Sequence, residues 1–465
     1  MRIERDFLGE KELPDGAYYG IQTLRALENF PVTNIPLKAY PQLIKALAMV
    51  KKAAVTANLQ LGILKEEVAS AIIQATDEII EGKFLDQFPI DILQATNTSF
   101  NMNVNEVLAN RASEILGGIK GEYQIVHPND HVNKSQSTND VANTATRIAC
   151  IILTRQLVQA LKELEDALRR KSEEFSDVIK IGRTCLQDAV PMTLGQEFEG
   201  YASIVGMMRE SIQSAEKMLS EINLGGTAVG TGVNAPRGYR QLALKKLSEI
   251  SGCSLRGARS LFGATQNEEA VAILSGKLKT LAVSLSKIAS DLSLLSSGPQ
   301  AGLNEINLPA LQPGSSIMPG KVNPVVPMLV NQVAYVVSGH DLAISMAIAG
   351  GQLEVNANGP VIDYCILESF KILIHAIEVF TKRCIVGITA NREVCQAYAK
   401  QNAGLATALI PLFGYETAAS VAREAIARKM TVVETVVERG LLDRERAEEL
   451  LLPANLIGPP GTQRD

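Results

Sequence analysis

Apolar residues recur along most of the chain at intervals of three and four positions, the spacing of one face of an α-helix. Within Pro41–Leu61, for example, Leu43, Leu47 and Val50 follow this spacing. Five longer stretches carry few helix-breaking residues and are predicted to be long helices: Asp140–Ser176, Pro191–Ile222, Asn267–Ser297, Pro324–Ala349 and Pro360–Val386. At about 1.5 Å per residue each could span on the order of 40 Å. The chain is therefore predicted to be mainly α, with a central helical bundle.

Shorter helices are predicted on both sides of this bundle: Pro41–Leu61, Lys65–Gly82, Asn105–Gly117, Thr417–Lys429 and Thr431–Arg439. The patterns predict three domains. Residues 1–137 form a mixed, mainly helical N-terminal domain, residues 138–394 the long-helix bundle, and residues 395–465 a small helical C-terminal domain. Many Ala, Ser and Gly positions inside the long helices favour close helix–helix contact and burial in an oligomer.

Charge and composition narrow the function classes. The 465 residues include 45 Lys and Arg against 50 Asp and Glu, a net charge of −5, without the basic clusters that nucleic acids require. No uninterrupted apolar segment is long enough to cross a bilayer, and the polar N-terminus does not resemble a secretory signal, so a cytoplasmic protein is expected. The six cysteines form no C-x-x-C pair and are expected to be reduced thiols, and the sequence indicates neither a metal site nor a cofactor.

Four polar segments interrupt the helical pattern: Thr96–Asn105 (TNTSFNMNVN), His127–Asp140 (HPNDHVNKSQSTND), Lys180–Asp188 (KIGRTCLQD) and Pro313–Asn323 (PGSSIMPGKVN). The run from Ser137 to Asp140 has two interpretations. Its side chains could cap the following helix, or they could line a helix N-terminus that cradles a carboxylate. In the third segment an internal ion pair between Arg183 and Asp188 is expected, which leaves Thr184 and Cys185 freer to face a pocket.

The fourth segment is the most specific of the four. Glycines at 314 and 320 let the backbone approach a ligand closely. Lys321 offers a cation for a carboxylate and Asn323 an amide donor, although a plain surface loop before the next helix is the alternative. The segment fails the phosphate-loop pattern, because Val322 follows Gly320–Lys321 and the glycine spacing is wrong.

Gly314–Pro324 (GSSIMPGKVNP) resembles the signature loop of the aspartase/fumarase superfamily. Further segments similar to this family follow in its order: AYYGIQTLRALENF, NMNVNEVLANRA, HPNDHVNKSQSTND, GRTCLQDAVPMTLGQEF and LGGTAVGTGVN. The resemblance implies a three-domain fold whose long central helices form a twenty-helix core in a homotetramer, with each active site built from three chains. It also implies a small dicarboxylate substrate. The residues after the signature loop resemble the aspartase branch more than the fumarase branch.

The resemblance also implies roles for individual residues. The expected reaction is the reversible anti elimination of ammonia from L-aspartate to give fumarate, with Ser315 as the general base. Lys321 and Asn323, assisted by Thr184, match the family's ligands of the α-carboxylate. The remaining matches are the β-carboxylate ligands Thr98, Ser137, Thr138 and Ser316, the amino-group contact Asn139, and a second anion site of His127, Asn129 and Asp130.

Three departures from the family pattern bear on the substrate. Cys185 stands where His or Gln is common, and Met328 stands where Glu is usual. The run before Thr98 is one residue shorter than usual, and Asn97 replaces a Gly. Loss of the His/Glu pair should hurt a hydratase more than a deaminase, because hydroxide needs a proton to leave. The alternatives are a lyase acting on an N-substituted succinyl amine, a fumarate hydratase, and a structural protein. Cys185 is expected to be a small packing residue more than a reactive thiol.

Overall fold

The computed structural model describes residues 1–457, and most of them are helical. The predicted mainly α fold is confirmed. Contacts divide the chain into two compact units. Unit 1 comprises Met1–Val158, Glu210–Thr280 and Tyr335–Ile374. Unit 2 comprises Gln159–Arg209, Leu281–Ala334 and His375–Asp465. The three-domain division stays a prediction, because these units are defined by contacts and not by order along the chain.

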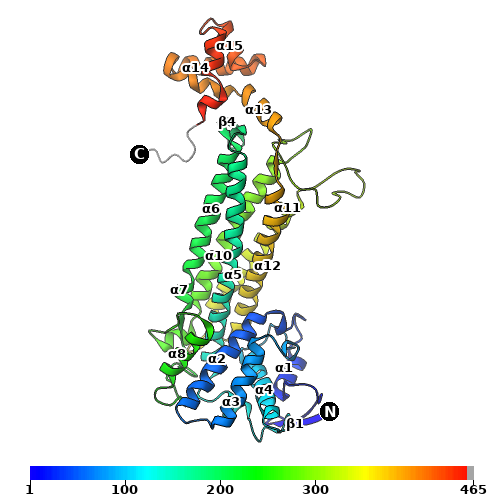
Figure 1. Ribbon diagram of the computed structural model, residues 1–465, viewed down its shortest axis with the longest axis vertical. Coiled ribbons are helices and arrows are strands. Elements are labelled where there is room, and N and C mark those ends of the chain that lie inside the picture. The colour runs from blue at the N-terminus through cyan, green and yellow to red at the C-terminus, as the bar shows by residue number, and fades with distance from the viewer. Residues whose placement is uncertain (458–465) are drawn as a thin grey trace. The chain divides into compact units, whose positions relative to one another are not determined.

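Five long helices contribute residues to both units: α5 (Thr138–Glu174), α6 (Leu194–Ser214), α10 (Glu269–Leu295), α11 (Val325–Ala349) and α12 (Gly359–Arg383). Within unit 1, α5 contacts α12 through a hydrogen bond from Thr146 to Asp363, and α10 contacts α11 through one from Ser275 to Asp341. The helices run alongside one another (Figure 1), which confirms the predicted bundle. Their apolar faces bury each other, as the three- and four-residue spacing requires.

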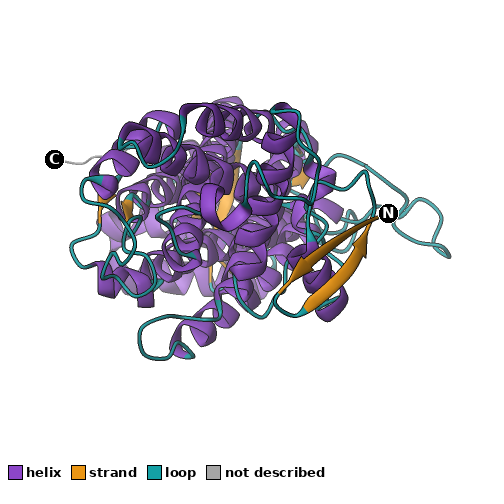
Figure 2. Ribbon diagram, turned by 90° about the horizontal axis from the view of Figure 1, so that it is seen from below, coloured by secondary structure: helices purple, strands orange, loops and turns teal. Residues whose placement is uncertain are grey.

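The predicted start of the second long helix is wrong. Pro191 lies in strand β4 (Gln187–Thr193), which pairs with β3 (Ile179–Thr184), and α6 begins only at Leu194. Ile181 lies opposite Pro191, and the edge of a two-stranded hairpin tolerates a proline. The other strands, β1 (Arg2–Asp6), β2 (Gly9–Leu13), β5 (Glu221–Ile222), β6 (Arg256–Gly257), β7 (Ile306–Asn307) and β8 (Thr389–Ala390), also form two-stranded pairs. Figure 2 shows how small these pairs are among the helices.

Unit 1 also contains α1 (Ile21–Asn29), α2 (Pro41–Gln60), α3 (Glu66–Ile80), α4 (Thr98–Ile115), α7 (Glu216–Leu219), α8 (Tyr239–Ser251) and α9 (Leu261–Gln266). A π-helical turn, Pro128–Val132, and two 3₁₀ turns, Leu37–Ala39 and Leu85–Gln87, connect them. Helix α2 packs against α3 and α8. It buries Ile44, Leu47 and Val50 completely or nearly so, as its apolar spacing predicts.

Helix α4 begins seven residues earlier than predicted, because the polar run around Asn101 is helical. Asparagine disfavours helix interiors by competing for backbone hydrogen bonds. Here the asparagine amides bond outside the helix: Asn101 to Asn133 and Thr138, and Asn103 to the backbone of Gln87. Tertiary contacts therefore override the local preference.

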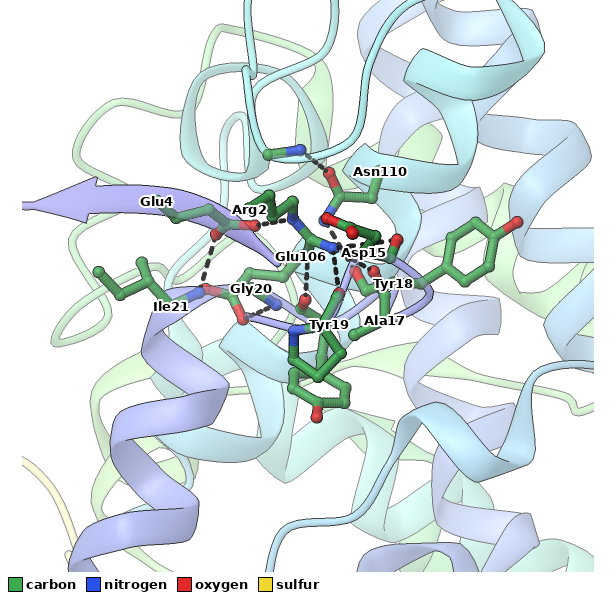
Figure 3. Close-up of polar contacts among 12 residues, drawn as sticks. Arg2, Glu4, Asp15, Ala17, Tyr18, Tyr19, Gly20, Ile21, Glu106 and Asn110 are labelled. Atoms are coloured by element: carbon green, nitrogen blue, oxygen red, sulfur yellow. Dashed lines mark hydrogen bonds and ion pairs between the residues drawn. The ribbon is translucent and has the colours of Figure 1, made fainter. Parts of the chain in front are cut away.

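A buried carboxylate fixes α4 against α1. Glu106 of α4 accepts a hydrogen bond from the backbone N–H of Gly20, just before α1 (Figure 3). It also accepts the backbone N–H groups of Gln22 and Thr23 in the first turn of α1. Gly20 has no room for a side chain, because a Cβ atom there would collide with the Tyr123 hydroxyl. Burial raises the pKa of Glu106 to about 7, although the bonded N–H groups oppose this shift. The contact holds α4, and therefore its Thr98 end, in place.

Unit 2 ends in short helices: α13 (Arg392–Gln401), α14 (Ile410–Arg428), α15 (Val432–Glu438) and α16 (Arg444–Leu450), with 3₁₀ turns at Ile385–Gly387, Ala403–Leu409 and Pro453–Leu456. Leu409, Val421 and Val436 lie at the centre of their common core. Residues 403–428 are long and apolar enough in composition for a membrane span. Gly414, at φ 78° and ψ 166°, interrupts them, so they form no single helix of the roughly 20 residues that a bilayer requires.

Candidate functional site

Two of the predicted carboxylate ligands lie at neighbouring helix starts in unit 1. Thr98 is the first residue of α4, and Thr138 is the first residue of α5. Asn101, one turn after Thr98, donates a hydrogen bond from Nδ2 to the Thr138 Oγ1 at 3.1 Å. Each helix start carries unpaired N–H groups and the positive end of the helix dipole, which favour a bound anion. The hydrogen bond from Asn101 to Thr138 thus brings together two helix starts that lie 40 positions apart in the chain.

The capping interpretation of the run from Ser137 to Asp140 is confirmed, and the carboxylate cradle stays a prediction. Ser137 caps α5, since its Oγ accepts the N–H of Asn139 at 3.3 Å, and Asp140 accepts the N–H of Ser137 at 2.9 Å. The second oxygen of Asp140 accepts the N–H groups of Gly225 and Thr227. Burial raises the pKa of Asp140 to about 6. Capping therefore occupies Ser137 and Asp140 and leaves the Thr138 hydroxyl at the helix end.

Asn139 uses its side-chain amide to donate to the carbonyl of Ala228 at 2.7 Å. Its backbone carbonyl accepts from the Asn223 amide at 3.2 Å. Both bonds tie the start of α5 to the segment after β5. The side-chain oxygen of Asn139 is the atom left to meet a ligand's ammonium group.

Lys51 of α2 is a functional candidate that the sequence patterns did not identify. Its Nζ donates to Asn133 Oδ1 and Gln136 Oε1, both at 2.9 Å, and its side chain is fully buried. Burial lowers the pKa of Lys51 to about 7, against the opposing effect of Asp140. The sequence did offer one sign that Lys51 is buried: it follows Leu47 by four residues and therefore lies on the buried face of α2. Asn133 Oδ1 also accepts from the Asn101 amide, so Lys51 is linked through this oxygen to the helix that begins at Thr98.

The predicted second anion site lies on the π-helical turn of unit 1. His127 caps this turn, since its Nδ1 accepts the N–H groups of Asn129 at 3.1 Å and Asp130 at 3.2 Å. The side chains of Asn129 and Asp130 are exposed. Anion binding by these three residues stays a prediction.

In unit 2, Thr184 ends β3, and Cys185 and Leu186 form the two-residue turn to β4. Their φ angles are 53° and 62°, the left-handed values that hairpin turns require and that non-glycine residues rarely adopt. The expectation of a packed Cys185 is wrong, because its thiol is exposed. A two-residue turn has no interior in which to bury a side chain.

The expected ion pair between Arg183 and Asp188 is present, but Arg183 lies closer to a second carboxylate. Its guanidinium lies 2.9 Å from Glu305 Oε1 but 3.9 Å from Asp188. Glu305 is completely buried and also pairs with Lys180 at 2.8 Å, and Lys180 reaches Glu197 at 2.5 Å. Two cations and two carboxylates therefore balance at the base of the hairpin that carries Thr184.

The loop between residues 314 and 323 is closed at its base. The N–H of Gly314 donates to the carbonyl of Lys321 at 2.7 Å, and the Asn323 amide donates to the carbonyl of Gly314 at 2.8 Å. A Cβ atom at Gly314 would lie 2.8 Å from the Lys321 oxygen, so only glycine fits. Asn323 thus already has one structural role.

Ser315 Oγ accepts two backbone N–H groups, that of Ile317 at 3.2 Å and that of Met318 at 3.0 Å. Donors of this kind stabilise negative charge on an oxygen. Ser316 and Lys321 are exposed on the same loop. The predicted site residues therefore form four groups: the helix starts and the π-helical turn in unit 1, and the hairpin tip and serine loop in unit 2. Among residues 1–457, no group of three or more His, Cys, Asp or Glu side chains is placed to hold a metal ion.

Comparisons with known proteins identify the family of this mainly helical chain. Residues 9–339 match the family model described as lyase, and residues 405–458 match that of the fumarase C C-terminus. The class is that of the fumarase-like lyases. The chain belongs to the lyase family of the aspartase/fumarase superfamily, as the resemblance predicted.

Relatives cover almost the whole chain. An aspartate ammonia-lyase of Helicobacter pylori is 52% identical over 99% of this chain and 98% of that protein, and one of Escherichia coli is 48% identical over 99% and 96%. A solved fumarate lyase:delta crystallin of Brucella melitensis, bound to cobalt, has a TM-score of 0.96 at 50% identity, covering 98% of this chain and all of that one. A class II fumarase of Schistosoma mansoni has a TM-score of 0.94 at 36% identity, covering 99% of this chain and all of that one.

Proposed function

We propose that the protein is an aspartate ammonia-lyase, which eliminates ammonia from L-aspartate to give fumarate. The observation that carries this proposal is identity of about half of all positions, over 99% of the chain, to relatives with this name from several bacteria. The geometry of the helix starts and of the serine loop supports it independently.

The helix starts of α4 and α5 would bind the β-carboxylate. Removing the proton from the neighbouring carbon places a second negative charge on this group. Hydroxyls of Thr98 and Thr138, with the free N–H groups of both helix ends, are donors aimed at that charge, and one such donor is typically worth about 2.7–4 kcal/mol in the transition state. Ser137 and Ser316 complete this set, while the side-chain oxygen of Asn139 would meet the substrate amine.

Ser315 would remove the carbon-bound proton. A serine hydroxyl is a poor base unless its oxyanion is stabilised, and the N–H groups of Ile317 and Met318 already point at Oγ. Lys321 adds a cation on the same loop and, with Asn323 and Thr184, would bind the α-carboxylate. The Ser315 oxyanion takes the proton from the carbon, and the C–H electron pair, held first as the dianionic carboxylate, forms the C=C bond of fumarate. The C–N bond of the ammonium substituent breaks, and its electron pair leaves with neutral ammonia.

Cys185 and Met328 favour an amine substrate over malate. Neither side chain is a proton donor of the strength of a His/Glu pair, and the leaving hydroxide of malate needs such a donor. An ammonium substituent can depart as neutral ammonia without one. A lyase for an N-substituted succinyl amine is the second candidate, because Cys185 stands where His or Gln is common, on an exposed turn with a left-handed backbone.

Homotetramer assembly, with each site built from three chains, is part of the proposal. The support is a row of exposed apolar side chains on α11. Tyr335, Leu342 and Met346 are 68%, 62% and 68% exposed, at spacings that share one helix face. Apolar rows of this kind are usually covered by a partner. We also propose a cytoplasmic enzyme whose partners are its own copies and a dicarboxylate, without nucleic acid, membrane, metal or cofactor.

One assay tests the function. Purified protein receives L-aspartate, L-malate or argininosuccinate, and fumarate is followed by its ultraviolet absorbance. We expect fumarate from L-aspartate alone. Fumarate from malate alone would overturn the amine proposal, and absence of fumarate from all three would favour the N-substituted or structural alternative.

A further inference from the structure

Asn97, directly before Thr98, does not cap α4. Asparagine is among the best N-cap residues, yet this side chain makes no cap hydrogen bond. Its Nδ2 donates instead to Asp363 Oδ2 of α12 at 3.3 Å. The side chain therefore ties the chain segment at Thr98 to a second helix.

Gly359 at the start of α12 makes this contact possible. A Cβ atom at position 359 would lie 2.5 Å from Asn97 Nδ2 and 2.8 Å from its Cγ and Oδ1. Asn97 and a side chain at 359 are thus mutually exclusive in the present geometry. Asn97 stands where the family pattern has Gly, in a run that is one residue short. The side chain that this chain has gained at position 97 occupies the space that the missing Cβ leaves at Gly359.

The tie continues into α5. Asp363 is 2% exposed, and its second oxygen accepts the Thr146 hydroxyl at 2.6 Å. Thr146 lies eight residues after Thr138 on the same helix. The bonds from Asn97 to Asp363 to Thr146 therefore connect the helix that begins with Thr98 to the helix that begins with Thr138.

We propose that Asn97, Gly359 and Asp363 form a brace that sets the distance between the Thr98 and Thr138 hydroxyls. This inference rests on the proposed function, because it assigns these residues to the dicarboxylate cradle. Asn97 and Asp363 are positioning residues: they act through Thr98 and do not touch the substrate. The brace compensates in this chain for the shortened run before Thr98.

The test is a double-mutant cycle on kcat/KM. Asn97→Gly removes the donor. Asp363→Asn keeps the shape of the side chain but leaves one acceptor oxygen where Asn97 and Thr146 each now have their own. Each change should lower kcat/KM about tenfold, since small misplacement of a catalytic donor is costly. The double variant should lose no more than the worse single variant, because both changes break the same tie.

A steric rescue separates positioning from general damage. Gly359→Ala should lower kcat/KM about tenfold in the native chain by displacing Asn97. In the Asn97→Gly background the same substitution should cost nothing further, because its Cβ then has space. Gly276→Ala on α10 is the matched control, since nothing lies within 4 Å of a Cβ there. Denaturation midpoints of all variants show whether folding is affected.

Additive losses, or a Gly359→Ala defect that persists without Asn97, would overturn the brace. The same double-mutant cycle can be measured without the reaction, by determining the affinity of each variant for the dicarboxylate succinate by calorimetry. If the native protein makes no fumarate from L-aspartate, the proposed function fails, whereas the calorimetric cycle still decides the brace: non-additive losses support it and additive losses or none contradict it.

Discussion

The helix starts in unit 1 and the serine loop in unit 2 are built in opposite ways. The helix starts are tied to several elements by Asn101, Asp140 and the buried Lys51. The hydrogen bonds of the loop join its own residues, from Gly314 to Lys321 and from Ser315 to Met318. A site that must stabilise charge needs fixed donors, whereas a segment that closes over a substrate must move as a body. The helix starts are therefore held by several elements, whereas the loop is held by bonds among its own residues, as the proposed roles of binding and proton removal require.

The largest expected effect concerns the loop. Ser315→Ala should lower kcat roughly 10²- to 10⁴-fold, the usual contribution of a positioned base, and leave KM nearly unchanged. Steady-state fumarate formation measures it. Ser293→Ala is the control, because that hydroxyl bonds only the carbonyl of Ala289 in its own helix. Near-normal turnover by Ser315→Ala would end the role of this serine.

The helix starts are tested by Thr138→Val, which keeps the shape of the side chain and removes its hydroxyl. We expect kcat/KM to fall roughly 10²- to 10³-fold, the cost of one oxyanion donor. Thr56→Val on α2 serves as the control, since its hydroxyl bonds only Lys52 of the same helix. An equal loss of kcat/KM in both variants would indicate a general effect on folding and would contradict binding of the carboxylate by Thr138.

The third prediction concerns the free energy of unfolding and the buried carboxyl group of Glu268 in unit 1. Burial raises its pKa from 4.5 to about 7, against Arg147, and one of its oxygens has no partner. The folded state therefore binds the proton of Glu268 more tightly than the unfolded state does. The contribution of this protonated carboxyl group to the free energy of unfolding is complete below pH 4.5 and is lost as the pH rises through about 7. Glu268→Gln should raise the free energy of unfolding at pH 8 by up to about 3 kcal/mol.

Urea unfolding at several pH values measures this effect. The gain should disappear below about pH 4.5, where Glu268 is protonated in both states. Glu199→Gln on α6 is the control, since its side chain is exposed and does not influence the pKa of Glu268. A pH-independent gain in Glu268→Gln would mean that titration is not its cause.

The smallest expected effect is that of a substitution at Gly314, in the loop that carries Ser315. Gly314→Ala should lower kcat/KM about tenfold, because a misplaced loop presents Ser315 at the wrong distance. The unfolding midpoint should not change, since the loop contributes little to the core. A stability loss as large as the activity loss would show that the loop is part of the folded framework and would weaken the contrast with the helix starts.

The sequence predicted what depends on local periodicity and motif. The long helices, the cap at Ser137 and the polar segments all followed from spacing and residue type. It missed what depends on distant partners. The helical run around Asn101, the buried Lys51 and the partner of Arg183 require contacts between segments far apart in the chain. The hairpin at Pro191 was missed because proline and the following helix pattern resemble a helix start.

The central claim is that residues of both units, contributed by different copies of the chain, make one site. Subunit mixing tests it most directly: Ser315→Ala and Thr138→Val tetramers, each nearly inactive, are unfolded together and refolded. If the two residues come from different chains, random mixing should restore about a quarter of native activity, since one site in four receives both intact residues. Activity no higher than that of the separate variants, with mixed tetramers demonstrated by mass spectrometry, would contradict the claim.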